Sequence, residues 1–388
     1  MRIIHFYNGL GGGVHSVINN LISLDKEVSL VSEVVYIVEN KYKNSFFRFH
    51  FNQPIKQHFF FYDKRSNLNY QFQQLYKIFN DENAILVAHD WFELGMISHL
   101  ALKNPVISIL HGNYEYYYDI YKKHKNSVSV FLCVSKALHN KLITNYNGIR
   151  DKIFHYSYPV KNRPFSFINH NKISIIFVAS NLADPNKNLA CIQAIELYLI
   201  EEHVYAEWHI IGAGIELPQL QKNLGISPER LFHYANVDNI DMDGIYSKAN
   251  IFLMPSFNEG LPVSLVEAMK NGLVPIVNTW NGSAQYLIET NLNGYVVQNN
   301  EPIEYSKYII YLSKNPRKMN ELSLAAYNSA HQLHDESLQI FEFKTYLKTA
   351  VTLNTIRKKE KVYGSRLDSP LIPAFLTKTL RIISCKLS

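Results

Sequence analysis

Two glutamates, Glu259 and Glu267, lie where a strand end, a loop and a helix start are predicted in succession. A buried strand is predicted to end at Met254, and Pro262 stands where a helix would begin, a position that tolerates its missing N–H. The free N–H groups and positive dipole end of that helix suit a phosphate. Carboxylates only accept hydrogen bonds, so the glutamates suit vicinal hydroxyls of a sugar or a ribose. Such a spacing alone is common on solvated helix faces, but the whole string favours a binding site.

A glycine cluster follows the first predicted strand. The segment HFYNGLGGGVHS places Gly11, Gly12 and Gly13 where a backbone without side chains can approach an acceptor or a donor phosphate. The rival interpretation is a dinucleotide fingerprint, but G-x-G-x-x-G counted from Gly9 requires a glycine where Val14 stands. This mismatch disfavours a nicotinamide-dependent enzyme.

These motifs need strands to position them. Short runs rich in Val and Ile alternate with roughly 10 to 20 residues of helical periodicity, as in parallel strands with crossover helices. The runs are residues 3–7, 28–38, 85–89, 106–110, 128–134, 173–179, 208–211, 251–254, 274–277 and 295–297. The pattern predicts two doubly wound α/β domains.

Two prolines near residues 158–164 interrupt both patterns and mark the predicted domain join. The predicted organisation is a domain over 1–160, a second over 161–335, a helix over 336–356 returning to the first domain, and a basic tail over 357–388. Because ligands bind beyond the carboxyl ends of parallel strands, two such domains facing each other predict an interdomain cleft.

The segment with Glu259 and Glu267, continued by Ala-Met and Gly272, resembles the retaining glycosyltransferases of family 4. Their hallmark is Glu, seven residues, Glu in the second of two Rossmann-like domains, the GT-B fold. The resemblance covers about residues 1–335 and is strongest over 177–294. It implies two Rossmann-like doubly wound domains facing an interdomain cleft, the first on the acceptor side and the second holding a nucleotide sugar.

The family resemblance implies contacts to the donor for the segment from Glu259 to Glu267. Glu267 would bind the ribose hydroxyls and Glu259 the sugar hydroxyls. The backbone of Gly260, Leu261 and Val263 would bind phosphate and sugar. Pro262 itself has no N–H to give.

The resemblance also implies residues at other strand ends. Gly212, Gly214 and Val237 would enclose the base and ribose, although a Gly-Ala-Gly can equally be an ordinary tight turn. His111 matches a histidine that faces the donor sugar, with the structural role common to histidines at strand ends as its alternative. His89, at the preceding strand end, is a candidate for acceptor contact, with a structural role as its alternative.

Lys187 matches the family lysine that neutralises the leaving diphosphate; its alternative is a solvated surface lysine. The family usually adds an arginine six or seven residues earlier, where this chain has Ser180 and Asn181. One of two expected cations is therefore missing, so either neighbouring donors compensate or catalysis is weak.

No metal or other cofactor is expected. The string Asp241-Met242-Asp243 imitates a metal-binding DxD, but it opens a predicted helix, where acidic residues complement the dipole. Cys133, Cys191 and Cys385 are an odd, scattered set, which argues against disulfides and structural zinc.

The net charge of +6, from 39 Lys and Arg against 33 Asp and Glu, is unevenly distributed. Residues 1–160 hold 17 basic and 12 acidic groups, residues 161–356 hold 14 and 19, and residues 357–388 hold 8 and 2. This asymmetry predicts an anionic partner at one end of the molecule. An anionic membrane carrying the acceptor is favoured over nucleic acid, which is not expected as a partner.

Two segments bear on that membrane hypothesis. Residues 41–65 contain six Lys or Arg and nine aromatic residues. This composition suits an anionic membrane interface, with single-stranded nucleic acid as a less favoured ligand, or a strand pair with core aromatics. The apolar residues of the tail fall within about half of a helical wheel. An interfacial anchor, a helix docked on the first domain and a frayed tail remain open.

The sequence therefore predicts a metal-independent retaining glycosyltransferase that uses a nucleotide diphosphate sugar. The expected acceptor is lipid-linked or an oligosaccharide of bacterial surface polysaccharide or lipopolysaccharide synthesis. Without an apolar run of roughly 18 residues or a secretory signal, a cytoplasmic location is expected, with peripheral attachment to the inner face of the plasma membrane left open. The alternative is a catalytically impaired nucleotide-sugar-binding or scaffold protein of GT-B shape.

Overall fold

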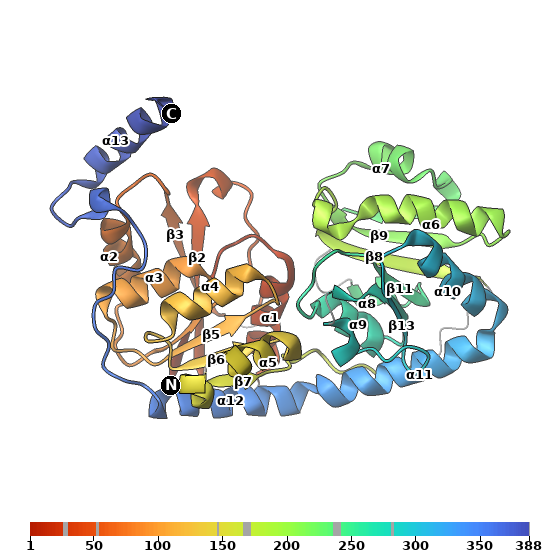
Figure 1. Cartoon of the computed structure of the whole chain (residues 1–388), viewed down its shortest axis with the longest axis horizontal. Helices are drawn as coiled ribbons and strands as arrows, with labels where there is room; N and C mark the ends of the chain where they lie inside the picture. Colours follow the sequence, from red (N-terminus) through yellow and green to blue (C-terminus); the bar gives the residue numbers. More distant parts are fainter. Residues whose placement is uncertain are drawn as a thin grey trace. The chain divides into compact units, whose positions relative to one another are not determined.

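The computed structural model describes residues 1–25, 30–51, 54–145, 147–165, 172–235, 242–280 and 283–387. The chain divides into two compact units (Figure 1). Unit 1 comprises Met1–Val134, Leu138–Tyr158 and Gln339–Ser388, and unit 2 comprises Ser135–Ala137 and Pro159–Leu338.

The described residues of unit 1 form a seven-stranded sheet in the order β3-β2-β1-β4-β5-β6-β7, with every neighbouring pair parallel. Its strands are β1 (Arg2–Tyr7), β2 (Val31–Glu39), β3 (Lys56–Tyr62), β4 (Ile85–Ala88), β5 (Val106–Leu110), β6 (Val130–Cys133) and β7 (Ile153–His155). Its connecting helices are α1 (Gly12–Ser23), α2 (Leu68–Phe79), α3 (Trp91–Leu100), α4 (Glu115–His124) and α5 (Lys136–Asn145). Consecutive strands joined by helices in a parallel sheet confirm a Rossmann-like domain.

Both faces of this sheet are buried, which explains its continuous apolar runs. On β2, Val35 and Ile37 belong to one core cluster with Phe72 of α2, whereas Val34 and Tyr36 belong to another with residues of α1. Successive side chains of a strand point to opposite faces, so each face is covered by its own helices.

The aromatic and basic stretch 41–65 contains the edge strand β3, paired with β2. The interpretation as a strand with core aromatics holds for part of it, because Phe60 and Tyr62 are buried. Phe47 and Phe59 are exposed. This stretch therefore divides between core and surface.

Unit 2 repeats the design, and its described residues form a six-stranded parallel sheet in the order β10-β9-β8-β11-β12-β13. The strands are β8 (Ser174–Asn181), β9 (Glu207–Ala213), β10 (Leu231–Tyr234), β11 (Ile251–Met254), β12 (Val274–Asn278) and β13 (Tyr295–Val297). The helices are α6 (Leu189–Glu201), α7 (Leu217–Leu224), α8 (Met242–Tyr246), α9 (Val263–Lys270), α10 (Pro302–Lys314) and α11 (Pro316–Leu333). The chain leaves β8 toward β9 on one side and returns to β11 on the other, which creates a topological switch point between β8 and β11.

The chain ends with α12 (Glu336–Thr352), an extended segment and α13 (Ala374–Leu387), and unit 1 includes all of it from residue 339 onward. Arg357 fastens the extended segment: its buried guanidinium donates to the carbonyl oxygens of Ser127, Leu102 and Asn104 at 2.6, 2.6 and 2.7 Å. Within the described ranges no helix combines the length and apolarity needed to cross a membrane.

Candidate active site

The residues of the predicted donor motif lie at the carboxyl edge of the unit 2 sheet. Glu259 lies in the loop after β11, and Lys187 ends a short 3₁₀ turn after β8. Because β8 and β11 border the topological switch point, a ligand is expected to bind beyond their carboxyl ends. The sequence placed both residues after strands, and the structure brings them together.

Lys187 and Glu259 form an ion pair. The Nζ of Lys187 lies 2.6 Å from Oε1 of Glu259, and the two side chains are 18% and 11% exposed. Asn186 holds the loops together by accepting from the Asn258 N–H at 3.0 Å and donating to the Asn258 carbonyl at 2.9 Å. The lysine is therefore a half-buried, fixed cation and not a freely solvated one.

Helix α9 begins at Val263, one residue after the predicted start, so Pro262 is its N-cap and supplies no side-chain acceptor to the first turn. The N–H groups and positive dipole end at this terminus suit an anion. At its other end, buried Lys270 donates to the Val160 carbonyl at 2.6 Å, to Asn162 Oδ1 at 2.8 Å and to the His334 carbonyl at 2.7 Å. These bonds fix the direction of the helix.

Glu267 lies on α9 beside the hydroxyl of Tyr246, which donates to Oε2 at 3.1 Å. Burial raises the pKa of Glu267 to about 7, although the Tyr246 hydroxyl favours the ionised form. Asp243 raises this pKa further and Arg163 lowers it. Near neutral pH, Glu267 is therefore balanced between an acceptor-only carboxylate and a neutral acid.

Arg163 pairs with Asp243 in the first turn of α8. This pairing supports the structural interpretation of Asp243 over a metal-binding one. Asp241 and Val237 lie outside the described residues. Within the described part of the chain, no group of three or more His, Cys, Asp or Glu side chains could hold a metal ion.

Close packing explains why residues 212 and 214 are glycines. A Cβ on Gly212, whose φ is +147°, would lie 2.1 Å from the carbonyl oxygen of Ala179. On Gly214, with φ +96°, it would lie 2.2 Å from Oδ1 of Asn181. Asn181 itself accepts from the Ala183 N–H at 3.0 Å. The glycines let the carboxyl end of β9 and the residue after it pack closely against the carboxyl end of β8, and Asn181 stands where the family arginine was expected.

In unit 1 the predicted histidines directly follow adjacent strands, His89 after β4 and His111 after β5. His89 Nδ1 and His111 Nε2 are 2.8 Å apart, so one nitrogen donates and the other accepts. Burial lowers the pKa of His111 to about 3 and that of His89 well below its ordinary value. The pair is therefore neutral at physiological pH, and neither ring acts as a cation.

The glycine cluster forms the start of α1 after β1. Gly11 and Gly12 both have φ +74°, and the Gly11 N–H donates to the Tyr7 hydroxyl at 2.7 Å. A Cβ on Gly11 would lie 2.8 Å from the Phe47 ring, whereas Gly13 has open space around it. The tight turn is therefore set by packing at Gly11, and open backbone begins at Gly13.

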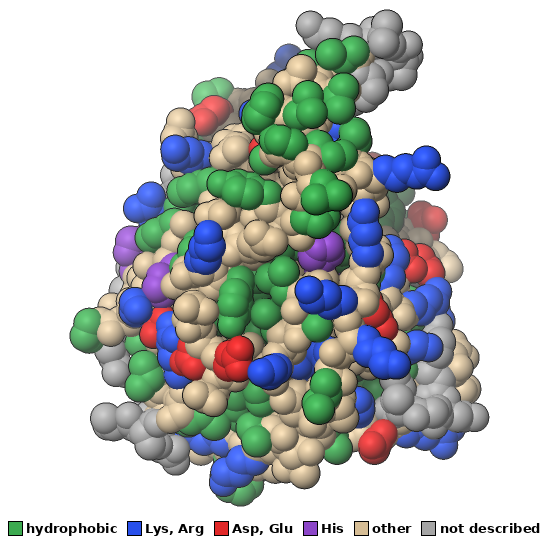
Figure 2. Space-filling model, turned by 90° about the vertical axis from the view of Figure 1, so that its left-hand side faces the viewer, with side chains coloured by type: hydrophobic (Ala, Val, Ile, Leu, Met, Phe, Trp, Pro, Cys, Tyr) green, Lys and Arg blue, Asp and Glu red, His purple; other side chains and the backbone are tan. Residues whose placement is uncertain are grey.

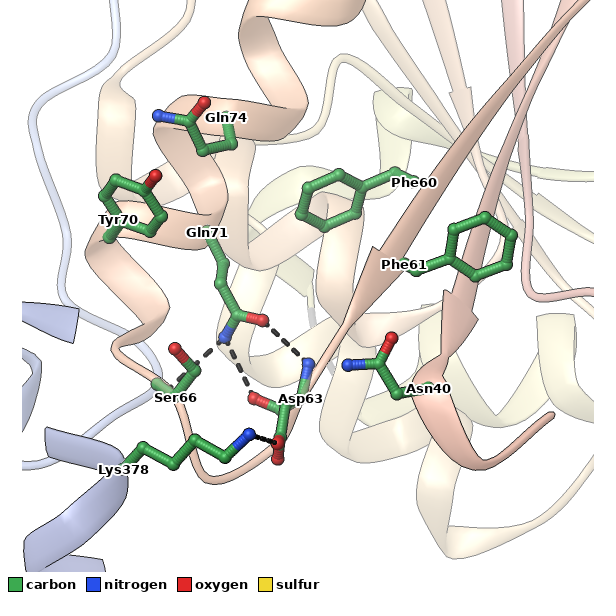
Figure 3. Close-up of a pocket in the computed structure, with 9 residues that line it drawn as sticks. All are labelled: Asn40, Phe60, Phe61, Asp63, Ser66, Tyr70, Gln71, Gln74 and Lys378. Carbon is green, nitrogen blue, oxygen red and sulfur yellow. Dashed lines mark hydrogen bonds and ion pairs between the residues drawn. The ribbon is translucent and has the colours of Figure 1, made fainter. Parts of the chain in front are cut away.

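A separate pocket of about 310 Å³ lies where β3 ends beside α2 and α13 (Figure 3). It is lined by Asn40, Phe60, Phe61, Asp63, Ser66, Tyr70, Gln71, Gln74 and Lys378. None of the predicted site residues lines it.

Sequence reasoning missed the partners of the predicted residues: Tyr246, Arg163 and Asn186. The turn signal Asp184-Pro185-Asn186 could have located Asn186 in a tight loop, since Asp184 caps the N–H of Asn186 at 3.0 Å. Nothing in the sequence spacing indicates that Tyr246 or Arg163 lies near Glu267.

Comparison with known proteins finds a family match within unit 2. Residues 161–329 match the family described as Glycosyl transferases group 1. The chain is 31% identical over 124 residues to an uncharacterised glycosyltransferase of Haemophilus influenzae, which covers 31% of this chain and 34% of that protein. It is 26% identical over 225 residues to a Campylobacter jejuni enzyme, GalNAc-alpha-(1->4)-GalNAc-alpha-(1->3)-diNAcBac-PP-undecaprenol alpha-1,4-N-acetyl-D-galactosaminyltransferase, covering 54% of this chain and 58% of that one. The matched region thus spans about a third of the length of the Haemophilus protein and just over half of the length of the Campylobacter enzyme.

Solved structures extend the fold comparison to most of the chain. Anabaena Alr3699/HepE in complex with UDP and glucose has a TM-score of 0.68 at 14% identity, over 90% of this chain and 100% of that one. The pneumococcal O-GlcNAc transferase GtfA in complex with UDP and GlcNAc has a TM-score of 0.68 at 15% identity, over 90% and 99%. These likenesses confirm the two-domain GT-B fold class at the level of fold.

Proposed function

From a second unit that matches the group 1 glycosyltransferases, we propose that the chain is a retaining, metal-independent glycosyltransferase. Its donor would be a nucleotide diphosphate sugar and its acceptor a hydroxyl of a lipid-linked or oligosaccharide substrate in bacterial surface polysaccharide or lipopolysaccharide synthesis. The observation that carries the proposal is the Lys187–Glu259 pair beside the N-terminus of α9 in that unit. The names of relatives such as the Campylobacter enzyme support the acceptor class.

Each donor residue is proposed to bind a different part of the nucleotide sugar. Glu267 accepts from the ribose hydroxyls and Glu259 from the sugar hydroxyls. The backbone of Gly260, Leu261 and Val263 binds phosphate and sugar. Gly212 and Gly214, together with Val237, enclose the base and ribose.

The proposed chemistry breaks the bond between the anomeric carbon and the diphosphate oxygen and forms one to the acceptor oxygen on the same face. Negative charge grows on the leaving diphosphate, where Lys187 and the α9 terminus stabilise it without a metal. The acceptor proton passes to a leaving-group oxygen. His111, neutral because of its burial, positions or polarises the sugar as a hydrogen-bonding group.

The Gly11–Gly13 segment and His89 are proposed to contact the acceptor or the phosphates. Open backbone at Gly13 and the position of His89 directly after β4 support this assignment. The proposed location is cytoplasmic. Cys133 and Cys191 are buried free thiols, which fits a reducing compartment.

The proposal is tested by screening nucleotide sugars by thermal shift, since a bound donor stabilises the chain by mass action. With the best donor, Glu267→Ala should weaken binding about tenfold or more in calorimetry, because a charged acceptor is lost. His111→Ala should lower turnover and leave donor binding nearly unchanged. Glu202→Gln, at an exposed carboxylate of unit 2, is the control and should alter neither.

Unchanged kinetics in both site variants would contradict the site assignment. The alternative is a catalytically impaired nucleotide-sugar-binding or scaffold protein, which Asn181 in place of the expected arginine favours. Donor binding without hydrolysis or transfer, across the acceptors tried, would establish that alternative and reject the enzyme.

A further inference from the structure

Helix α13 turns several of its polar side chains toward the rest of unit 1. Lys378 Nζ lies 2.9 Å from Oδ2 of Asp63, as Figure 3 shows, and Arg381 Nη2 lies 2.5 Å from Oδ2 of Asp368. Thr377, on the same side of the helix, is fully buried. A helix that helps close a protein core buries its apolar face, so this arrangement is the reverse of the usual one.

The apolar side chains of α13 are left exposed instead. Phe375, Leu376, Leu380 and Ile383 are 73%, 41%, 40% and 50% exposed, and Leu371 just before the helix is 90% exposed. At about 100° per residue, the four helical positions fall within roughly 140° of the wheel, away from the buried side. Figure 2 shows green side chains gathered along α13 at the top of this view.

The polar anchor prevents the helix from rotating its apolar face inward. Asp368 is 1% exposed and accepts from the N–H groups of Leu68 and Ser365 at 2.8 and 2.6 Å, besides pairing with Arg381. Asn67 Nδ2 donates to the Ile372 carbonyl at 3.0 Å just before the helix. Turning α13 over would leave the buried carboxylate of Asp368 without its cation, which is costly.

Basic side chains lie beside the exposed apolar face, and those of Lys64, Arg65, Lys378 and Arg381 also pair with carboxylates. Residues 357–388 hold 8 basic and 2 acidic groups. The side chains of Lys64 and Arg65 are 56% and 57% exposed, and Arg381 Nη1 donates to the Lys64 carbonyl at 3.3 Å, which places this loop beside α13. An exposed apolar helix face next to cations matches an anionic lipid interface.

We propose that the exposed face of α13 docks on an anionic lipid surface, with the helix lying along the interface and its polar side held by unit 1. A second copy of the chain would also bury apolar area. It would, however, bring two strongly basic tails together, whereas an anionic membrane attracts each tail. The proposal does not depend on transferase activity, because its test measures vesicle binding alone.

The test is flotation of the full chain with vesicles of phosphatidylcholine, with and without phosphatidylglycerol. The wild type should bind the anionic vesicles at least about tenfold more strongly than the neutral ones, and added salt should weaken binding. The triple variant Phe375→Ser, Leu380→Ser, Ile383→Ser should bind about tenfold or more weakly while keeping its fold, since these side chains are exposed. Phe341→Ser, at a 68% exposed site on α12, is the matched control and should bind as the wild type does.

Fluorescence gives an independent measurement. In Phe375→Trp, anionic vesicles should shift the added emission to the blue as the indole leaves water. No binding by the wild type, equal binding by the triple variant, or no blue shift would overturn the proposal. A concentration-dependent dimer that the triple variant abolishes and vesicles do not displace would assign the face to a second copy instead.

Discussion

Replacing Glu267 with Gln should stabilise the protein at the same time as it impairs donor binding. Gln keeps the size of the side chain and can still accept from the Tyr246 hydroxyl, which lies 3.1 Å from Oε2 in the wild type. The substitution removes the ionisable group whose burial raises the pKa from the ordinary 4.5 to about 7. A site selected for binding commonly sacrifices stability in this way.

The sign and size follow from proton linkage. Because the folded-state pKa is raised, Glu267 contributes favourably only while it is protonated, and this contribution is lost as pH rises from about 4.5 to about 7. The whole shift corresponds to about 3 kcal/mol. From pH 5.5 to pH 8, the free energy of unfolding of the variant should rise by about 2 kcal/mol relative to that of the wild type.

Calorimetric unfolding of the full chain at these two pH values measures the effect. For a unit of this size, about 2 kcal/mol corresponds to roughly 4–8 °C in Tm. The Tm of the variant minus the Tm of the wild type should therefore be larger at pH 8 than at pH 5.5 by that amount. Glu202→Gln, at an exposed carboxylate, should change by less than about 0.5 kcal/mol at either pH. Titration with the nucleotide sugar should show the Glu267 variant binding about tenfold more weakly.

A Glu267→Gln variant that is less stable than the wild type at pH 8, or equally shifted at both pH values, would refute the reasoning. Stabilisation with unchanged donor affinity would retain the electrostatic account and reject the ribose contact. The two parts of the prediction can therefore fail separately.

Three further predictions concern Gly212, the pair of buried histidines and Arg357. Gly212→Ala should cost about 3 kcal/mol or more in thermal unfolding, because its Cβ would meet the Ala179 carbonyl at 2.1 Å in a left-handed backbone. His89 and His111 should show no titration between pH 5 and 8 in ¹⁵N-detected NMR, because burial lowers the pKa of each. Arg357→Met should destabilise the full chain by about 3 kcal/mol in urea unfolding, because it leaves buried carbonyl groups without a donor.

Gly225→Ala is the control for the first of these variants, since its φ is +65° but no heavy atom lies within 4 Å of the added Cβ. Gly225→Ala should lower the free energy of unfolding by about 1 kcal/mol, which is the cost of an alanine at a positive φ without a steric clash. Equal losses at both glycines would remove the steric argument for the close packing of Gly212 in β9 against β8. A histidine resonance titrating near pH 6.5 from either strand end would contradict the buried neutral pair.

The doubly wound fold was predictable because parallel strands buried on both faces leave continuous Val and Ile runs. The strand Ile251–Met254 matches its run residue for residue, and Val106–Leu110 does so too. Lys56–Tyr62 was predicted as a strand only as one of the open alternatives for residues 41–65, and Ile153–His155 was not predicted as a strand. The first is an edge strand with two exposed side chains, and the second has three residues, so neither carries that pattern.

The candidate site could be located from sequence but its pairing could not. Ligand sites lie beyond strand ends, and strand ends are visible as the ends of apolar runs, so the positions of Glu259 and His89 after strands could be predicted. Lys187 and His111 were selected as candidates because they match the family resemblance as well. Which of them touch depends on the path of each loop, and a loop path is set by backbone bonds such as those of Asn186. No periodicity encodes that path.

The acidic balance of residues 161–356, 14 basic against 19 acidic groups, at first opposes a diphosphate site there. Local pairing removes the conflict. Glu259 is paired with Lys187, Asp243 with Arg163, and burial holds the pKa of Glu267 near neutrality, so part of its population is uncharged. These three carboxyl groups are thus largely neutralised, and they oppose an anion less than the net charge of the segment suggests. Net charge governs long-range attraction, whereas local pairs such as these govern the potential at short range.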